Sequence, residues 1–224
     1  HSVYLINDTL IPEYGLKAEI KLMNLNSEIV ADKRLSVDAQ MNHSKKIYDL
    51  DSLDPCSPVY FLDLKLFSGS GKLIHDNFYW LSSKQEVLDF EKSEWYYTPN
   101  KQYADFTDIH QMSEVEIEPC VDMNTDGNET QMIVTLYNPS ETLAFFIELD
   151  IAAEKSGESI LPVFWDDNYV SILPGETKVV TGFISNADLN DDNPVLKLNG
   201  WNLKQGKCVA LMQPINQQEC GDQS

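Results

Sequence analysis

Two neighbouring aspartates, Asp166 and Asp167, stand beside the aromatic residues Trp165 and Tyr169. A retaining glycosidase uses two carboxyl groups about 5–5.5 Å apart, placed around one glycosidic bond. Adjacent residues of an extended chain point to opposite faces, so this pair is poorly placed to share one bond. We therefore predict a solvated loop here. The alternative is a sugar platform made by Trp165 or Tyr169.

The residues after this pair support the loop. Leu-Pro-Gly-Glu at 173–176 is a turn sequence, because Pro174 fixes its own φ angle and Gly175 tolerates a positive one. The turn leads into a strand that we predict over residues 177–184.

A second cluster of oxygen-bearing side chains, Asp122, Asn124 and Asp126, precedes Gly127. Its spacing matches the first six positions of a calcium loop, D-x-[DN]-x-[DN]-G. The acid expected at position 12 is missing, because Ile133 stands there. Asp-Gly between two strands is also a strong hairpin signal. We predict a plain turn first and a calcium site second, and calcium is the one cofactor that the sequence suggests.

Other catalytic signatures are absent from the sequence. It contains no G-x-S-x-G nucleophile elbow and no glycine-rich phosphate loop. Structural or surface positions explain the histidines better than nucleophilic catalysis does; they are His1, His43, His75 and His110. We therefore predict no catalytic residue in this chain.

The cysteines are spread along the chain, at Cys56, Cys120, Cys208 and Cys220. None belongs to a C-x-x-C pair, and no histidine stands at a zinc-like spacing from them. Four cysteines in 224 residues are too few for a disulfide framework. Isolated thiols and at least one disulfide remain as alternatives.

The chain is acidic, with a formal net charge of −20, and the charge is uneven. Residues 1–110 carry 11 basic and 17 acidic side chains, whereas residues 111–224 carry 5 and 19. Such a field repels nucleic acid and anionic lipid, and it leaves neutral ligands, cations and proteins as partners. No apolar run reaches the ~18 residues that a membrane span needs.

Short β-like runs separated by turn residues recur along the chain. Their spacing predicts an all-β fold of two tandem immunoglobulin-like antiparallel β-sandwiches. We place them at residues 1–100 and 101–215, followed by a frayed tail at 216–224. The first block shows only five or six strands, so we expect its first strand to lie before His1. Residues 82–111 are polar and aromatic, and we expect a connector that packs by its aromatic side chains.

Phrases in both halves form a pattern. They are SVYLINDTL (2–10), VYFLDLKLF (59–67), NFYWL (77–81), Asp167-Asn168-Tyr169, Leu-Pro-Gly-Glu (173–176) and Asn199-Gly200-Trp201-Asn202. Their order and spacing resemble the immunoglobulin-like domains that follow the catalytic barrel in family 2 glycoside hydrolases, of the endo-β-mannosidase, β-mannosidase and exo-β-glucosaminidase type. The resemblance covers nearly the whole chain, roughly residues 2–81 and 113–212.

The resemblance implies that the chemistry lies elsewhere. In the family, two glutamates on an upstream (β/α)₈ barrel act as acid/base and nucleophile, and no position here matches them. The chain would then be a non-catalytic scaffold of a retaining hydrolase acting on β-mannosides or β-glucosaminides. Trp165, Tyr169 and Trp201 would pack on a neighbouring domain or contact sugar.

The resemblance also implies partners and a location. The partners would be the barrel of the same polypeptide and, through the parent enzyme, an oligosaccharide. We expect a periplasmic or secreted protein, because such enzymes are exported and the sequence carries N-glycosylation sequons at Asn7, Asn42 and Asn128.

Two other functions fit a pair of β-sandwiches, since fold does not fix function. A carbohydrate-binding module predicts aromatic residues on one exposed face and measurable affinity for oligosaccharides. An adhesin or receptor ectodomain predicts stable folding alone and no enzyme domain upstream.

Overall fold

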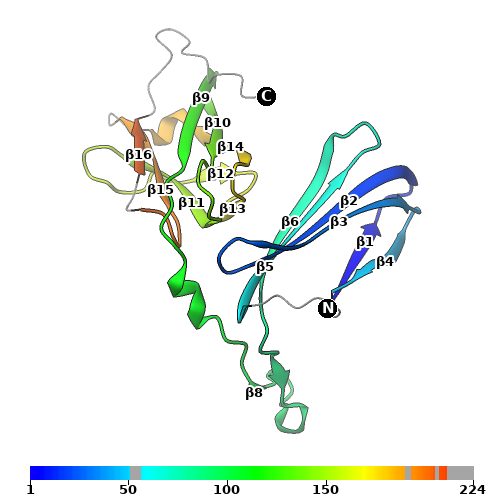
Figure 1. The fold of residues 1–224 in the computed structure, drawn as a ribbon. Helices are drawn as coiled ribbons and strands as arrows, with labels where there is room; N and C mark the ends of the chain where they lie inside the picture. The colour runs from blue at the N-terminus through cyan, green and yellow to red at the C-terminus, as the bar shows by residue number, and fades with distance from the viewer. Residues whose placement is uncertain (51–56, 190–192, 205–206, 211–224) are drawn as a thin grey trace. The chain divides into compact units, whose positions relative to one another are not determined.

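The computed structural model describes residues 1–50, 57–189, 193–204 and 207–210. It confirms the all-β prediction, with two compact units at residues 1–112 and 113–224 (Figure 1). The helical elements in the described chain are three short 3₁₀ helices, η1 (Phe90–Lys92), η2 (Thr107–Gln111) and η3 (Asn186–Asp188). None of the described helices is long and apolar enough to cross a membrane.

Unit 1 is a sandwich of two unequal antiparallel sheets. Its main strands are β1 (Ser2–Asn7), β2 (Glu13–Asn24), β3 (Ile29–Ala39), β4 (His43–Asp49), β5 (Val59–Phe67) and β6 (Leu73–Ser82). One sheet has the order β3-β2-β5-β6, and the other consists of β1 and β4 alone. Alternating side chains form the core, because every second residue of β1, and of β2 from Leu16 to Leu22, is buried. The β1–β4 pair therefore packs on the four-stranded sheet through one face.

Unit 2 has two four-stranded sheets. Its strands are β9 (Glu118–Asp126), β10 (Glu129–Tyr137), β11 (Ala144–Ala153), β12 (Val163–Trp165), β13 (Val170–Ile172), β14 (Thr177–Ser185), β15 (Pro194–Asn199) and β16 (Lys207–Ala210). The sheet orders are β12-β14-β10-β9 and β13-β11-β15-β16. The core between them consists of buried apolar side chains, and Met132, Val134 and Leu136 are fully buried.

The two units share one topology. The order β3-β2-β5-β6 in unit 1 corresponds to β13-β11-β15-β16 in unit 2, and the β1–β4 pair corresponds to β10–β14. Unit 2 adds β9 and β12, one on each side of the β10–β14 pair. The units are therefore two copies of one architecture, although no close sequence repeat links them.

A buried asparagine stands at the same topological point in both units. Asn7 ends β1 and Asn138 directly follows β10, and both side chains are less than a tenth exposed. Each precedes a hydroxyl residue by two positions, Thr9 in unit 1 and Ser140 in unit 2. The sequence signal is thus Asn-x-Thr/Ser at the end of a strand.

The hydrogen bonds of these two asparagines are also the same. Each Oδ1 accepts from the backbone N–H and the hydroxyl two residues later, at 3.1 and 2.9 Å for Asn7 and at 3.1 and 2.6 Å for Asn138. Each Nδ2 donates to the carbonyl four residues later, Ile11 or Thr142, at 2.9 Å. Each Nδ2 also donates to the last residue of a strand in the opposite sheet, Ala39 or Ile172. One amide thereby ties the two sheets together.

The Asn7-Asp8-Thr9 sequon therefore has a structural role. The Nδ2 of Asn7 already donates two hydrogen bonds in a buried position. A glycan on that nitrogen would remove one of these two donors. Asn7 therefore serves the fold.

Cys120 is disulfide-bonded, which decides between the two alternatives for the thiols. Cys56 and Cys220 lie outside the described residues, as does the side chain of Cys208. The chain thus contains at least one disulfide, and four isolated thiols are excluded.

The connector of unit 1 differs from the sequence-based expectation. Strands β7 (Val87–Leu88) and β8 (Asn100–Gln102) pair into a short hairpin, and the aromatic residues between them face solvent. Trp95 is 93 % exposed and Tyr96 is 73 % exposed. The predicted packing of these aromatics within the connector is therefore wrong for the hairpin tip.

We predict that Asn7→Ala and Asn138→Ala each lower the free energy of unfolding of their own unit by about 2–4 kcal/mol. Each substitution leaves buried backbone donors and acceptors without partners. Urea denaturation followed by circular dichroism measures the loss. The control is Asn26→Ala, at an exposed position, which should change stability by less than ~0.5 kcal/mol. Equal effects at Asn7 and Asn26 would contradict a structural role for the asparagine turn.

Candidate functional site

The aspartate pair of unit 2 is held by structural contacts. Asp166 Oδ1 accepts a hydrogen bond from the Thr181 backbone N–H at 2.7 Å, and the Asp166 N–H donates to the Thr181 carbonyl at 2.9 Å. Asp167 forms an ion pair with Lys178 at 3.0 Å. Both carboxylates therefore fasten their loop to β14, as expected for a structural loop.

The next residue fastens the same loop to the other sheet. Asn168 Oδ1 accepts from the Leu149 N–H at 2.8 Å, and its Nδ2 donates to the Leu149 carbonyl at 3.0 Å. The Asn168 side-chain amide thus bonds both backbone groups of Leu149 on β11, as a residue of a paired strand would. It places Tyr169 on the surface with φ +56°, a left-handed conformation that an aromatic residue rarely adopts.

Tyr169 packs at a tilt against a second strained aromatic residue, Phe146. The ring centroids lie 5.1 Å apart, and Phe146 also has φ +56°. Phe146 sits where the β11–β13 register shifts, between Ala144 and Ile147, so the bulge turns its ring outward. Two left-handed aromatic residues in contact store roughly 1–3 kcal/mol each, and such strain is concentrated at functional sites.

Trp201 joins this surface through the backbone. Its N–H donates to the Phe145 carbonyl at 3.0 Å, and the buried Phe145 ring lies 5.7 Å from Phe146. The buried Asn202 fixes the segment, because its Oδ1 accepts from the Phe145 N–H at 2.9 Å. We call Phe146, Tyr169 and Trp201 the aromatic corner. Tyr169 and Trp201 are each about half exposed, at 50 % and 49 %.

Polar groups border the aromatic corner. The Tyr169 hydroxyl donates to Glu148 Oε1 at 2.9 Å, and Asn199 Nδ2 donates to Glu148 Oε2 at 3.2 Å. The hydrogen bond to Glu148, and then its negative charge, raise the pKa of the Tyr169 phenol above the ordinary value. An exposed aromatic face beside a carboxylate and an amide suits a sugar or another protein surface.

Trp165 does not belong to this corner. It lies on β12 and packs against the core of unit 2. Its ring covers Gly182 so closely that a Cβ atom there would lie 2.4 Å from the ring. The structure thus separates the three aromatic residues singled out in the sequence, with Tyr169 and Trp201 on the surface and Trp165 against the core.

The proposed calcium ligands lie on a regular strand. Asp122, Asn124 and Asp126 occupy alternate positions of β9, opposite Ile133, Gln131 and Glu129 of β10. The hairpin closes at Gly127, which has φ +59°. Alternate residues on a strand lie about 6.5 Å apart, whereas a calcium loop wraps its ligands around the ion. Among the described residues, no group of three or more His, Cys, Asp or Glu side chains could hold a metal. The calcium site stays a prediction.

Two further aromatic surfaces had no clear signal in the sequence. Phe164 and Phe183 stack at 5.0 Å on the outer face of the β12–β14 pair, and both are exposed. In unit 1, Trp95 and Tyr96 contact edge to face at 4.8 Å at the tip of the β7–β8 hairpin. Strand register and exposure reveal these sites, whereas residue type alone does not.

We predict that the Tyr169 phenol ionises above the ordinary tyrosine pKa of about 10, and that Glu148→Gln moves this pKa back down. The raised pKa means that the contact stabilises the fold below the ordinary pKa and that this contribution is lost as pH rises through the raised value. Ultraviolet difference titration against Tyr169→Phe isolates this one phenol. Glu141→Gln, at an exposed acid, is the control. An unchanged pKa in Glu148→Gln would disprove the contact.

Comparison with known proteins identifies the family. Residues 95–203 match the exo-β-D-glucosaminidase Ig-fold domain, and residues 1–84 match the mannosidase Ig/CBM-like domain. The chain is 35 % identical over 175 residues to an exo-β-D-glucosaminidase of Arthroderma benhamiae, which covers 78 % of this chain and 20 % of that protein. It is 32 % identical over 207 residues to an exo-β-D-glucosaminidase of Streptomyces avermitilis, covering 90 % of this chain and 23 % of that protein.

Solved structures agree with the sequence matches. The crystal structure of the Amycolatopsis orientalis exo-chitosanase CsxA superposes with a TM-score of 0.87 at 29 % identity, over 94 % of this chain and 25 % of that one. A β-D-mannosidase of Dictyoglomus thermophilum shares the fold, with a TM-score of 0.56 at 19 % identity. The chain thus spans about a fifth to a quarter of the length of these proteins. The resemblance seen in the sequence is confirmed: the chain consists of Ig-fold domains of the glycoside hydrolase family 2 enzymes that include the exo-β-D-glucosaminidases and mannosidases.

Proposed function

We propose that these two domains are the non-catalytic scaffold of a retaining glycoside hydrolase that acts on β-D-glucosaminides. The main support for the proposal is that the aspartate pair flanked by aromatic residues makes structural contacts within unit 2. Asp166 binds the Thr181 backbone and Asp167 binds Lys178, so the pair is not arranged as acid and nucleophile. A retaining mechanism needs two carboxyl groups that converge on one bond.

The aromatic corner is the proposed docking surface for the rest of the parent polypeptide. Tyr169 and Trp201 combine a large apolar area with a polar atom, which favours burial at an interface with a wet rim. Glu148 and Asn199 would form part of that rim. Trp165 packs against the core and Gly182 and is not expected to make the contact itself.

The net charge favours glucosaminides over mannosides as the substrate class. Several relatives are named exo-β-D-glucosaminidase, including those of A. benhamiae and S. avermitilis, and one of Lilium longiflorum is named mannosylglycoprotein endo-β-mannosidase. Oligomers of glucosamine are cationic when their amines are protonated, whereas mannosides are neutral. A chain of net charge −20 would attract the former and raise their local concentration. A periplasmic or secreted location would suit such a polymeric substrate.

A carbohydrate-binding module is the second candidate, and the aromatic corner is the observation that favours it. The Phe146–Tyr169 ring pair, with Tyr169 half exposed beside a carboxylate, could hold a sugar ring directly. Calorimetry with glucosamine and mannose oligosaccharides separates the two. Heat that disappears in Tyr169→Ala would favour the module, and its absence would favour the scaffold.

We predict that residues 1–224 release no nitrophenol from 4-nitrophenyl β-D-glucosaminide above the buffer rate, because Asp166 and Asp167 are tied to β14 and do not converge on one bond. Absorbance at neutral pH measures the release, and the full-length parent enzyme is the positive control. Turnover by residues 1–224 that is lost in Asp166→Asn or Asp167→Asn would overturn the scaffold proposal.

A further inference from the structure

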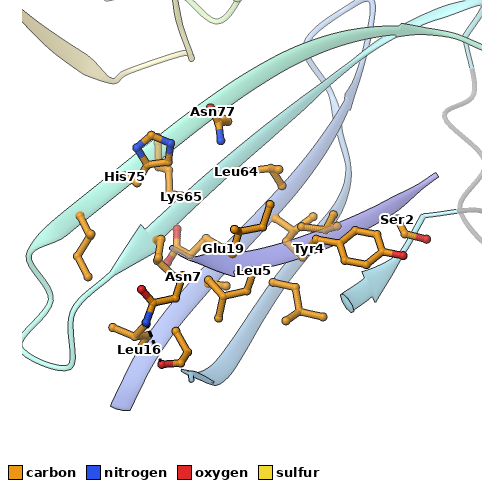
Figure 2. Close-up of a pocket in the computed structure, with 18 of the residues that line it drawn as sticks. Ser2, Tyr4, Leu5, Asn7, Leu16, Glu19, Leu64, Lys65, His75 and Asn77 are labelled. Carbon is orange, nitrogen blue, oxygen red and sulfur yellow. Dashed lines mark hydrogen bonds between the residues drawn. The ribbon is translucent and has the colours of Figure 1, made fainter. Parts of the chain in front are cut away.

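Unit 1 has an open side. A cavity of about 980 Å³ lies between β1 and the sheet face made by β5 and β6. Figure 2 shows Leu5 and Asn7 of β1 among its lining residues, with Leu64, His75 and Asn77 of the opposite sheet. The register pairs Leu62 with Tyr79 and Leu64 with Asn77, so these four side chains share the sheet face that borders the cavity.

The opening follows from the unequal sheets. β1 packs across β2 and β3, because Leu5 shares a core cluster with Leu16, Ala18 and Val37. β1 pairs with β4 along one edge, and within the described part of the chain no strand pairs with its other edge. Val3 of β1 also reaches Tyr60 and Leu62 of β5, so the part of the inner face that stays open lies around Leu64 and Tyr79. Tyr79 is consequently 44 % exposed, although it lies on the inner face.

Unit 2 shows what fills the same place. There β10, the counterpart of β1, pairs with β14 on one edge and with β9 on the other. β9 comes immediately before β10 in the chain and is paired with it at every position from Glu118 to Asp126. Val121 and Met123 of β9 pack against the core and cover the sheet below. In the described part of unit 1, β1 and β4 correspond to β10 and β14, and no strand there corresponds to β9 or to the short β12.

We propose that unit 1 is completed by an extended strand from the same polypeptide, formed by the residues directly N-terminal to His1. It would pair antiparallel with β1 and close the cavity, as β9 does in unit 2. The relatives are four to five times as long as the matched region, so a polypeptide of this type has chain to supply the strand. The inference does not depend on the proposed function.

The unit 2 counterpart specifies the strand. β9 has nine residues and reaches β10 through the tight turn at Gly127 and Asn128. The completing strand should have a similar length and a short turn before β1. It should carry apolar side chains at alternate positions, as β9 does at Val121 and Met123, because these would cover Leu64 and Tyr79.

An open edge beside an apolar cavity is also a surface on which a second copy could pair. The test therefore compares residues 1–224 with the same chain extended by the twelve to fifteen residues that precede His1 in the parent gene. A Gly-Ser extension of equal length is the control. Hydrogen exchange and thermal melting are measured at two protein concentrations.

We predict that the native extension raises the melting temperature of unit 1 by at least about 5 °C and slows exchange of β1 amides at least about tenfold. The Gly-Ser extension should do neither. Protection that rises with protein concentration in unextended chains would instead assign the edge to a second copy. Equal exchange in all three chains would overturn the proposal.

A matched pair of variants tests the position of the strand. Tyr79 and Trp80 are adjacent on β6 and similarly exposed, at 44 % and 41 %, but they face opposite sides of the sheet. Tyr79→Ala should remove at least about half of the melting-temperature gain given by the native extension, and Trp80→Ala should leave the gain intact. Equal loss in both variants would contradict a strand over the cavity.

Discussion

A buried asparagine amide sets the geometry of both domains. In each unit it stands where the chain leaves one sheet and enters the other, and its two N–H groups bond to both sides of that crossing. The amide oxygen meanwhile organises the Asn-x-Thr or Asn-x-Ser turn that reverses the chain. A hydrocarbon side chain at this point would leave several buried backbone groups without partners, which is costly in a dry core. The sandwich and every surface on it depend on this crossing.

The surface of unit 2 follows from similar side-chain-to-backbone bonds. Asp166 and Asn168 act as substitute backbone, one toward β14 and the other toward β11. They hold Tyr169 in a left-handed conformation that its own side chain disfavours. Polar residues that resemble a catalytic pair in the sequence are therefore the supports of an aromatic surface. We propose that the aromatic corner, and not the carboxylates, is the surface that contacts the rest of the parent polypeptide.

The sequence predicted the architecture well, because alternation and turn residues are local signals. The strands around LKAEIKLMN and TQMIVTLYN, the turn at Gly175 and the two-domain β-sandwich all follow from residue periodicity. The loop at Asp166 and Asp167 was also predictable, because adjacent residues of an extended chain point to opposite faces. The sequence did not predict where side chains lie in space: Trp165 and Tyr169 are four residues apart, yet Trp165 covers Gly182 and Tyr169 contacts Phe146. Such placement depends on which strands pair and in which register, and local sequence patterns do not specify this. The bulge at Phe146 and the matching inter-sheet hydrogen bonds of Asn7 and Asn138 were missed for the same reason.

The central claim is that the aromatic corner is covered by the rest of the parent polypeptide. Hydroxyl-radical footprinting with mass spectrometry, on residues 1–224 and on the full-length enzyme without sugar, measures this most directly. The account predicts that oxidation of Phe146, Tyr169 and Trp201 falls several-fold in the full-length enzyme. Equal oxidation in both proteins, with protection that appears only when glucosamine oligosaccharide is added, would contradict it and assign the corner to sugar binding.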